Sequence, residues 1–508
     1  MMTAVFALRC PSKHLHLITV IALVASLQWP GTGQAQSAST GLASLPITTS
    51  LGFETLRLAQ GEHLGLVGSS LLFDIGSDWA VGPAVYGAAS GRRGGLFVGG
   101  VELQRRWRLA DGLSLATDLF AGGGGGAAAP VGGGLMLRPA VTLWKDLGPA
   151  LQGGLSWSSV RFPSGQIASQ QVGLVLAWHD EFAYFPHTDA GSNLGAAPGT
   201  STGLGFDRIA ATATSYRLTD GSARHIGLAG ARAERRSRAD GLAWGIEAAA
   251  AAKGDAAGYM EFLGTGAYSV APLPSVLPSW QVGVRVGAGL AGGGAVPTGG
   301  GVIGKAAATM AWSPAPGWTL GGEFGALRGM RSALRAREAQ VWLGIDLEPG
   351  FDGRGDAPGT VVRTEWVGTL QHHVRAERRD GTRQSLDTIG LKLNRYLGEN
   401  FYLSGQAHSA FAGGAGGYSI GLFGAGLATS PRSSWRLGAE VLIGAAGGGG
   451  VATAGGALTQ GLAWASWAPS KRSEWRAGLG ASRPLRGGSL VSPIAEVSWS
   501  RAFGLAGR

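Results

Sequence analysis

The residues of this sequence best suited to chemistry are histidines that stand beside carboxylates or beside one another. His179 precedes Asp180 and Glu181, an order that would suit a general base with an orienting carboxylate. Neighbouring residues of a β-strand point to opposite faces, so a regular strand would hold His179 and Asp180 apart. The same geometry separates His372 from His373 as metal ligands, and the sequence has no GxSxG, HExxH or P-loop motif. The sequence therefore predicts neither an enzyme nor a bound cofactor or metal ion.

A second group of polar residues recurs at matching places in three parts of the chain. Asp118, Arg285 and Glu440 occupy equivalent positions, each in a segment where apolar residues alternate with small or polar ones. On a strand, such polar residues share one face, which predicts a wall around a wet interior whose mixed charges give weak selectivity. The candidates for this interior face are Ser114, Asp118, Gln281, Arg285, Glu323, Arg436 and Glu440.

Each of these three segments leads into a glycine-rich hairpin. The hairpins span residues 122–134, 292–301 and 447–456, and glycine makes up 90 of the 508 residues. Their regular spacing indicates an internal triplication, which sets the architecture of the chain. The hairpins themselves have three interpretations: an inward constriction, tall flexible loops, or small residues left by duplication. The sequence does not choose among them.

Alternation with a period of two residues is the strongest local signal. Between Trp280 and Leu290, and again between Trp435 and Ile443, one face is apolar and the other is small or polar. The segments have the length of roughly 9–11 residues that a membrane-spanning strand needs. They predict about eight strands in each of three units, at residues 50–186, 203–348 and 361–503, or about 24 strands in all.

The beginning of the chain has the features of a secretory signal peptide. Arg9 and Lys13 precede an apolar stretch at residues 17–27, and Gly33-Gln34-Ala35 suits cleavage after residue 35. Residues 36–49 then form an N-terminal segment before the first strand. The exported chain contains no cysteine, and its basic excess consists of scattered arginines, which argues against a nucleic-acid partner.

The last segment, residues 493–503, resembles the sorting signal of bacterial outer-membrane β-barrel proteins. It is an amphipathic strand with Val497, Trp499, Arg501 and Phe503 on one face, closing on the aromatic Phe503, and residues 504–508 follow as a short extension. The resemblance implies an all-β fold, a transmembrane antiparallel up-and-down β-barrel of about 24 strands in the outer membrane of a Gram-negative cell. It also implies outer-membrane lipid, lipopolysaccharide and the barrel-assembly machinery as partners, and an anionic solute or polymer is a further candidate.

Two architectures satisfy every backbone polar group in lipid: one large barrel or three tandem eight-stranded barrels. We favour one large barrel, because the junctions between the units are short. Its expected function is a pore or conduit for a solute or polymer. The alternatives are a non-conducting adhesin or assembly scaffold, an outer-membrane enzyme, and a soluble secreted propeller or sandwich.

Overall fold

The computed structural model describes residues 41–507, except 77, 195–201, 220–223, 238–240, 274, 278, 348–358, 432, 471–472 and 487–490. The signal peptide predicted for residues 1–35 lies outside the described part of the chain. No described residue lies in an α-helix, and two 3₁₀ turns occur at Ala59–Gly61 (η1) and His187–Asp189 (η2). None of the described helices is long and apolar enough to cross a membrane.

The all-β class, the strand number and the three units of eight strands are confirmed: the described residues form 24 strands. The first unit contains β1 (Ala43–Arg57), β2 (His63–Gly76), β3 (Trp79–Ser90), β4 (Phe97–Ala110), β5 (Leu113–Gly125), β6 (Met136–Asp146), β7 (Leu151–Arg161) and β8 (Ala168–Tyr184). The second contains β9 (Arg208–Leu218), β10 (His225–Arg236), β11 (Leu242–Lys253), β12 (Met260–Val270), β13 (Trp280–Gly292), β14 (Val302–Ala315), β15 (Trp318–Gly329) and β16 (Arg335–Asp346). The third contains β17 (Thr360–Glu377), β18 (Arg383–Tyr396), β19 (Phe401–Ala412), β20 (Ser419–Ala428), β21 (Trp435–Gly447), β22 (Ala457–Ser470), β23 (Ser473–Pro484) and β24 (Ser492–Gly507).

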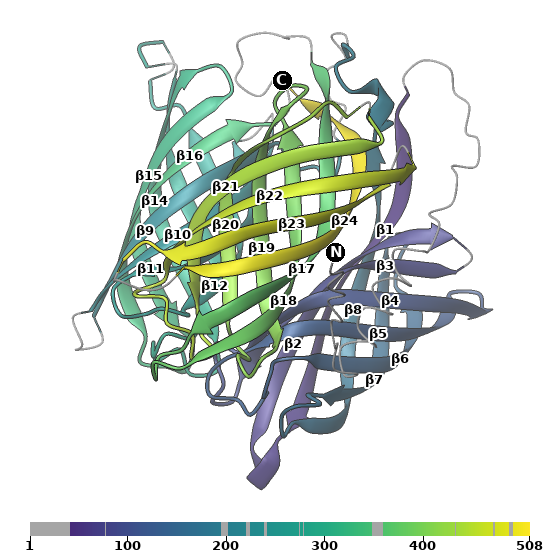
Figure 1. The fold of residues 1–508 in the computed structure, drawn as a ribbon, viewed down its shortest axis with the longest axis vertical. Helices are drawn as coiled ribbons and strands as arrows, with labels where there is room; N and C mark the ends of the chain where they lie inside the picture. Colours follow the sequence, from purple (N-terminus) through teal and green to yellow (C-terminus); the bar gives the residue numbers. More distant parts are fainter. Residues whose placement is uncertain are drawn as a thin grey trace, which may run out of the picture.

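The preference for one large barrel was wrong, because each unit closes on itself. β8 returns to pair with β1, β16 with β9, and β24 with β17, which gives three separate up-and-down barrels. We call them barrels 1, 2 and 3; Figure 1 shows them in purple to blue, teal, and green to yellow. The closing ladders are long, running from Ala43 against Tyr184 to Glu54 against Gly173 in barrel 1. Among the described strands, the main ladders therefore stay within one barrel, and only isolated bridges such as Phe185 with Gly504 connect one barrel to another.

Alternation along each strand sorts the side chains into an inner and an outer set. In β21, Arg436, Glu440 and Leu442 are buried inside barrel 3, whereas Leu437 and Val441 are 63% and 68% exposed on its outer surface. Large apolar side chains cover the outside of all three barrels in this way. A soluble protein rarely exposes apolar area on this scale, whereas a membrane barrel requires it.

The two ends of the barrels differ. Both ends of the described chain, and the short turns β2–β3, β4–β5 and β6–β7, lie at one end, which we call the terminal end. The longer glycine-rich connections lie at the other, the glycine end. Outward-facing tryptophans gather toward the terminal end, among them the stacked pair Trp280 and Trp312, with ring centroids 6.1 Å apart. Aromatic side chains prefer this position in a membrane, at the level of the headgroups.

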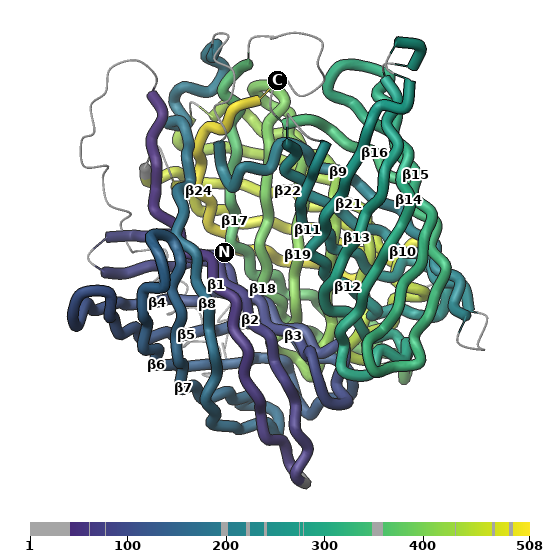
Figure 2. Tube along the Cα trace, turned by 180° about the vertical axis from the view of Figure 1, so that it is seen from behind, coloured from purple at the N-terminus to yellow at the C-terminus, as the bar shows by residue number. Residues whose placement is uncertain are grey.

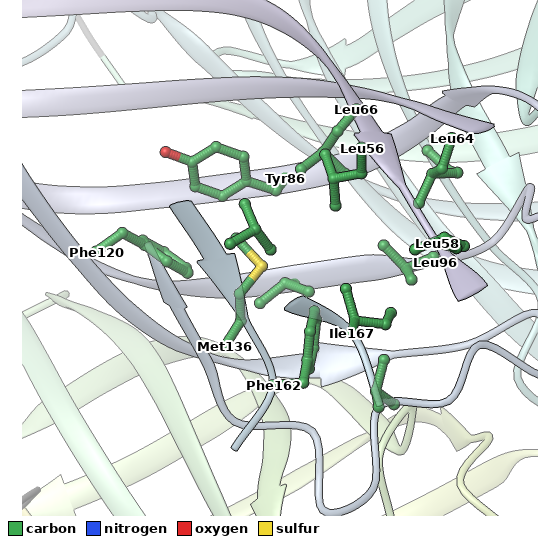
Figure 3. Close-up of a cluster of buried hydrophobic side chains, with 14 of the residues drawn as sticks. Leu56, Leu58, Leu64, Leu66, Tyr86, Leu96, Phe120, Met136, Phe162 and Ile167 are labelled. Atoms are coloured by element: carbon green, nitrogen blue, oxygen red, sulfur yellow. The ribbon is translucent and has the colours of Figure 1, made fainter. Parts of the chain in front are cut away.

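An apolar cluster fills each barrel near its glycine end. In barrel 1, Leu56, Leu64, Phe120 and Phe162 pack together inside the barrel (Figure 3). Tyr259 and its neighbours do the same in barrel 2, and Tyr418 and its neighbours in barrel 3. These side chains come from opposite walls and from the connecting loops, so they stabilise each barrel from within.

The glycine-rich hairpins join the barrels in a ring. Each barrel contributes a hairpin, between its fifth and sixth strands, and a loop, between its third and fourth strands. The loop of barrel 1 contacts the hairpin of barrel 2, that of barrel 2 the hairpin of barrel 3, and that of barrel 3 the hairpin of barrel 1. Gly94 N donates to Gly299 O at 2.9 Å, and Gly416 N to Gly132 O at 3.1 Å. The contact is head to tail and closes after three steps, as in a cyclic trimer.

Candidate functional site

Barrel 2 encloses the densest group of charged side chains. The guanidinium of Arg232, which has no exposed surface, pairs with Glu247 at 2.6 Å and with Glu323 at 2.7 Å. Arg285 also reaches Glu323, at 3.1 Å, and Lys305 pairs with Glu247 at 2.9 Å. These five residues come from five strands, β10, β11, β13, β14 and β15, so the network of alternating charges ties opposite walls of the barrel together.

Barrels 1 and 3 contain related networks. In barrel 3, Arg436 pairs with Glu474 at 2.9 Å and with Glu365 at 3.2 Å, and its Nη2 donates to the Tyr396 hydroxyl at 2.6 Å. In barrel 1, Arg138 donates two parallel hydrogen bonds to Glu54, at 2.9 and 3.0 Å. This two-pronged geometry is the strongest that an arginine and a carboxylate form.

The seven polar residues singled out in the sequence lie on the same side of their strands. Asp118, Arg285, Glu323, Arg436 and Glu440 are buried inside their barrels, and each bonds to neighbouring polar groups. The two nearest the terminal end are more open: Ser114 is half-buried and Gln281 is exposed at the rim. That they line a conducting lumen stays a prediction.

The space left inside the first barrel is small. A void of about 40 Å³ is bordered by Tyr86, Glu102, Asp118 and Arg138, which is room for about three water molecules. An eight-stranded barrel is just wide enough for its own side chains to fill it. Between this void and the glycine end lies the apolar cluster of Figure 3, so the interior offers no continuous wet path to a solute.

The histidines that the structure describes lie apart from one another or on opposite faces of a strand. His179 points inward and its Nδ1 lies 3.1 Å from the Thr48 hydroxyl, whereas Asp180 accepts a hydrogen bond from the backbone of Glu181. His372 lies on the outer face, 2.6 Å from Asp387, while His373 is buried. Among the described residues, no group of three or more His, Cys, Asp or Glu side chains is placed to hold a metal ion.

A much larger cavity lies between the barrels. It measures about 1780 Å³ and is bordered by outward-facing side chains of all three. Barrel 1 contributes Val85 and Leu119, barrel 2 Phe262, and barrel 3 Leu391 and Phe423, all of them exposed. The lining runs from residues of the glycine end to residues of the terminal end. We call this space the central cavity.

The wall of the central cavity is apolar and, over much of its area, made of glycine and alanine. Among the bordering residues that the structure describes, only Arg232, Glu247, Arg395 and Arg501 carry a formal charge. Arg232 and Glu247 pair with each other inside barrel 2, so their charges are turned away from the cavity. Water needs two to four polar partners to be held in a cavity, and this wall offers few.

The central cavity was not predicted from the sequence. Its wall is formed by three separate barrels, whereas the sequence was interpreted as one large barrel. One signal for it was present. Arg501 falls on the same face of the last segment as Val497 and Trp499, where a barrel wall should be apolar. A cation on such a face marks a place that is not ordinary lipid contact.

An ion pair between Arg93 and Glu62 connects two loops at the glycine end of barrel 1. The guanidinium of Arg93, in the β3–β4 loop, donates to both carboxylate oxygens of Glu62 at 2.8 and 2.9 Å, and to the carbonyl of Ala128 at 2.8 Å. The hydrogen bond from Arg93 lowers the pKa of Glu62 below its ordinary value. Glu62 therefore stabilises this loop fully above its unfolded pKa of about 4.3, and the stabilisation is lost as the pH falls through the lower folded value.

We expect Glu62→Gln to lower the melting temperature slightly at about pH 7, and we expect this difference to shrink as the pH falls through the lowered folded pKa of Glu62, because the wild-type carboxyl then becomes protonated. The effect is small because the pair is about one quarter exposed. Thermal unfolding of both proteins across this range checks it. A difference that persists or grows at acid pH would contradict the assigned role.

Comparison with solved structures finds bacterial outer-membrane β-barrels as neighbours. OccK2 (OpdF) of Pseudomonas aeruginosa, in complex with glucuronate, is 11% identical, with coverage of 91% of this chain and 98% of that one and a TM-score of 0.23. The siderophore receptor PirA of the same organism is 10% identical, with coverage of 92% and 81% and a TM-score of 0.27. The FrpB iron transporter of Neisseria meningitidis is 9% identical, with coverage of 91% and 81% and a TM-score of 0.27. No protein-family model and no curated protein matches the sequence. At such low scores, these neighbours carry no conclusion about the function of this chain.

Proposed function

We propose that this chain is an outer-membrane protein that binds and conducts an apolar, lipid-like molecule through the central cavity. The observation that carries the proposal is the contrast between two kinds of space. The described interior of barrel 1 retains a void of about 40 Å³ among polar side chains, whereas the space between the barrels measures about 1780 Å³ and has apolar walls. The sequence predicted a conduit through a barrel. We propose that the route instead lies outside the barrels, in the central cavity between them.

The location in the outer membrane is part of the proposal. Three closed barrels with apolar outer surfaces and tryptophans at one end have the properties that lipid demands of β-strands. The same location makes outer-membrane lipid, lipopolysaccharide and the barrel-assembly machinery expected partners, and these stay predictions. The central cavity continues the same apolar surface, so hydrocarbon is the material that fills it at least cost.

Filling the central cavity should abolish binding and transport. Gly405 and Gly421 border it from β19 and β20, and a side chain added at either would meet no atom within 4 Å. We expect the double variant Gly405→Trp/Gly421→Trp to fold normally and to lose most of the uptake of a fluorescent long-chain fatty acid into vesicles that contain the purified protein. The indole rings would occupy the space that the acyl chain needs.

Gly461→Trp is the matched control. Gly461 faces outward from β22 of the same barrel, away from the central cavity, and a Cβ there would meet its nearest atom, the Glu440 carbonyl oxygen, at 4.0 Å. Uptake by this variant should equal that of the wild type. If Gly405→Trp/Gly421→Trp transports as well as Gly461→Trp, the central cavity is not the route. Large, stable ionic conductance in planar bilayers would instead assign the route to a wet lumen.

A further inference from the structure

Four arginines lie together on the outer surface of barrel 2, at its glycine end. Arg328 is on β15, Arg335 and Arg337 are on β16, and Arg217 is on β9, and these three strands are neighbours in the barrel. All four side chains are exposed, and they alternate along their strands with residues that point into the barrel. None of them borders the central cavity. We call these four residues the arginine patch.

The register of the strands sets the four arginines against one another. Arg328 is the cross-strand partner of Arg335, and Arg337 is the cross-strand partner of Arg217. Directly opposite residues hold their Cβ atoms about 4.5–5.5 Å apart, and like charges in such a pair destabilise a sheet. Arg335 and Arg337 share one face of β16, about 7 Å apart along the strand. The arginine patch therefore concentrates its positive charge on a small area of the barrel wall.

The described part of the chain does not compensate these charges. Among the described residues, no ion pair or hydrogen bond joins a guanidinium of the arginine patch to another side chain. The nearest carboxylates along β15 and β16, Glu323 and Glu338, point into the barrel, where they pair with Arg232 and Lys305. Like charges held in register on an outer surface are a cost to the fold that a bound anion would remove.

The equivalent face of barrel 1 lacks the arginine patch. The last hairpin of barrel 1 has the same register and the same connection length as that of barrel 2, and it places Ala168 and Gln170 where barrel 2 has Arg335 and Arg337. Barrel 1 closes without these charges. The arginine patch is therefore a feature of one barrel and is not needed to close an eight-stranded wall.

The arginine patch lies at the edge of the apolar outer surface. Toward the terminal end, the next large outward-facing side chains on β15 and β16 are Phe324 and Val341, which are 67% and 60% exposed. The stacked tryptophans Trp280 and Trp312 lie toward the opposite end of the same barrel. Long cationic side chains at the edge of an apolar band occupy the headgroup level of a membrane. Short turns mark the periplasmic side of a bacterial barrel, which assigns the glycine end to the outer leaflet.

We propose that the arginine patch binds the phosphate groups of lipopolysaccharide, the anionic lipid of the outer leaflet. Guanidinium groups donate paired, charge-assisted hydrogen bonds to phosphate oxygens, and the bound phosphates relieve the repulsion within each cross-strand pair. The acyl chains of the same molecule lie along the apolar outer surface of β15 and β16. The inference shares the outer-membrane location with the proposed function, but it does not use the central cavity.

Lipid A, the phosphorylated and acylated anchor of lipopolysaccharide, and its dephosphorylated form isolate the contribution of the phosphates. We expect the purified wild-type protein in detergent to bind lipid A at least about tenfold more tightly than the dephosphorylated lipid, measured by native mass spectrometry. Arg335→Gln/Arg337→Gln should remove most of this preference, because it takes one arginine from each cross-strand pair. Binding of the dephosphorylated lipid should be the same in both proteins.

Arg57→Gln/Arg161→Gln is the matched control. It removes the same charge from the outer surface of barrel 1 at the glycine end, where both arginines are exposed. This variant should keep the wild-type preference for lipid A. Lipid A should also raise the melting temperature of the wild type and of the control much more than that of Arg335→Gln/Arg337→Gln, since a ligand that binds the folded protein stabilises it.

Equal affinity of the wild type for the two lipids, or the same loss of preference in both double variants, would overturn the assignment of the arginine patch. Tighter binding of inorganic phosphate than of lipid A would overturn the lipid and leave a free anion as the ligand. Gly405→Trp/Gly421→Trp should bind lipid A as the wild type does. Loss of lipid A binding in that variant would place the lipid in the central cavity, whereas loss of fatty-acid uptake alone bears only on the proposed function.

Discussion

Arg232→Leu is expected to lower the free energy of unfolding by about 3–5 kcal/mol. The wild-type guanidinium is fully buried and contacts Glu247, Glu323 and the Gln340 side chain, the last at 2.6 Å. Removing it leaves Glu247 with Lys305 alone and Glu323 with Arg285 alone as counter-charges in the buried interior, and this loss of charge compensation is the main part of the cost. Denaturant unfolding in detergent micelles, followed by tryptophan fluorescence, measures the change.

Arg235→Leu provides the matched control on the same strand. Arg235 points to the outer face of barrel 2, where its guanidinium lies over the Trp244 ring at 5.9 Å from the centroid. An exposed cation–π contact contributes about 0.5–1 kcal/mol, so this variant should be nearly as stable as the wild type. Arg232→Lys keeps a charge and should fall between the two. If both leucine variants lose the same stability, the interior network is not what holds barrel 2 together.

Gly417→Ala should open the contact between barrels 3 and 1. Gly417 has a φ of +93°, and a Cβ there would lie 2.8 Å from the Gly126 nitrogen of the opposing hairpin. The left-handed backbone costs an alanine about 1–2 kcal/mol, and the overpacked contact adds about 1–3 kcal/mol. We expect a lower melting temperature and faster proteolysis of the hairpin at residues 126–134, while the barrels themselves remain closed.

Gly414→Ala separates these two costs. Gly414 lies in the same loop and has a φ of +67°, but a Cβ there would meet nothing within 4 Å. It should show the backbone cost alone, without faster cleavage of the hairpin in barrel 1. Equal proteolysis of the two variants would mean that close packing against Gly126 does not hold the barrels together.

Local pattern was enough to predict the strands and the face on which each residue lies. β21 begins at Trp435, where the alternation begins, and Glu440 is buried on the face that its position implied. The triplication was visible because three hairpins of unusual composition recur. The role of the hairpins could not be predicted, because the atoms that Gly417 approaches belong to a hairpin of another barrel, almost 300 residues earlier in the sequence.

Closure could not be predicted from the same pattern. A strand such as β8 has the same alternation whether it pairs with β1 or with β9, because alternation reports faces and not partners. The short junctions were taken to favour a continuous wall. In the structure, the end of β8 instead lies beside the last strand of the chain, where Phe185 and Gly504 exchange backbone hydrogen bonds (Figure 2). The central cavity exists because each barrel closes separately, so it could not be predicted from the pattern either.

The head-to-tail ring has the arrangement of a cyclic trimer, but its three barrels belong to one polypeptide. A trimer of separate chains dissociates on dilution, so its melting temperature depends on protein concentration. Covalent fusion removes that dependence, and the melting temperature of this protein should be the same in dilute and concentrated samples.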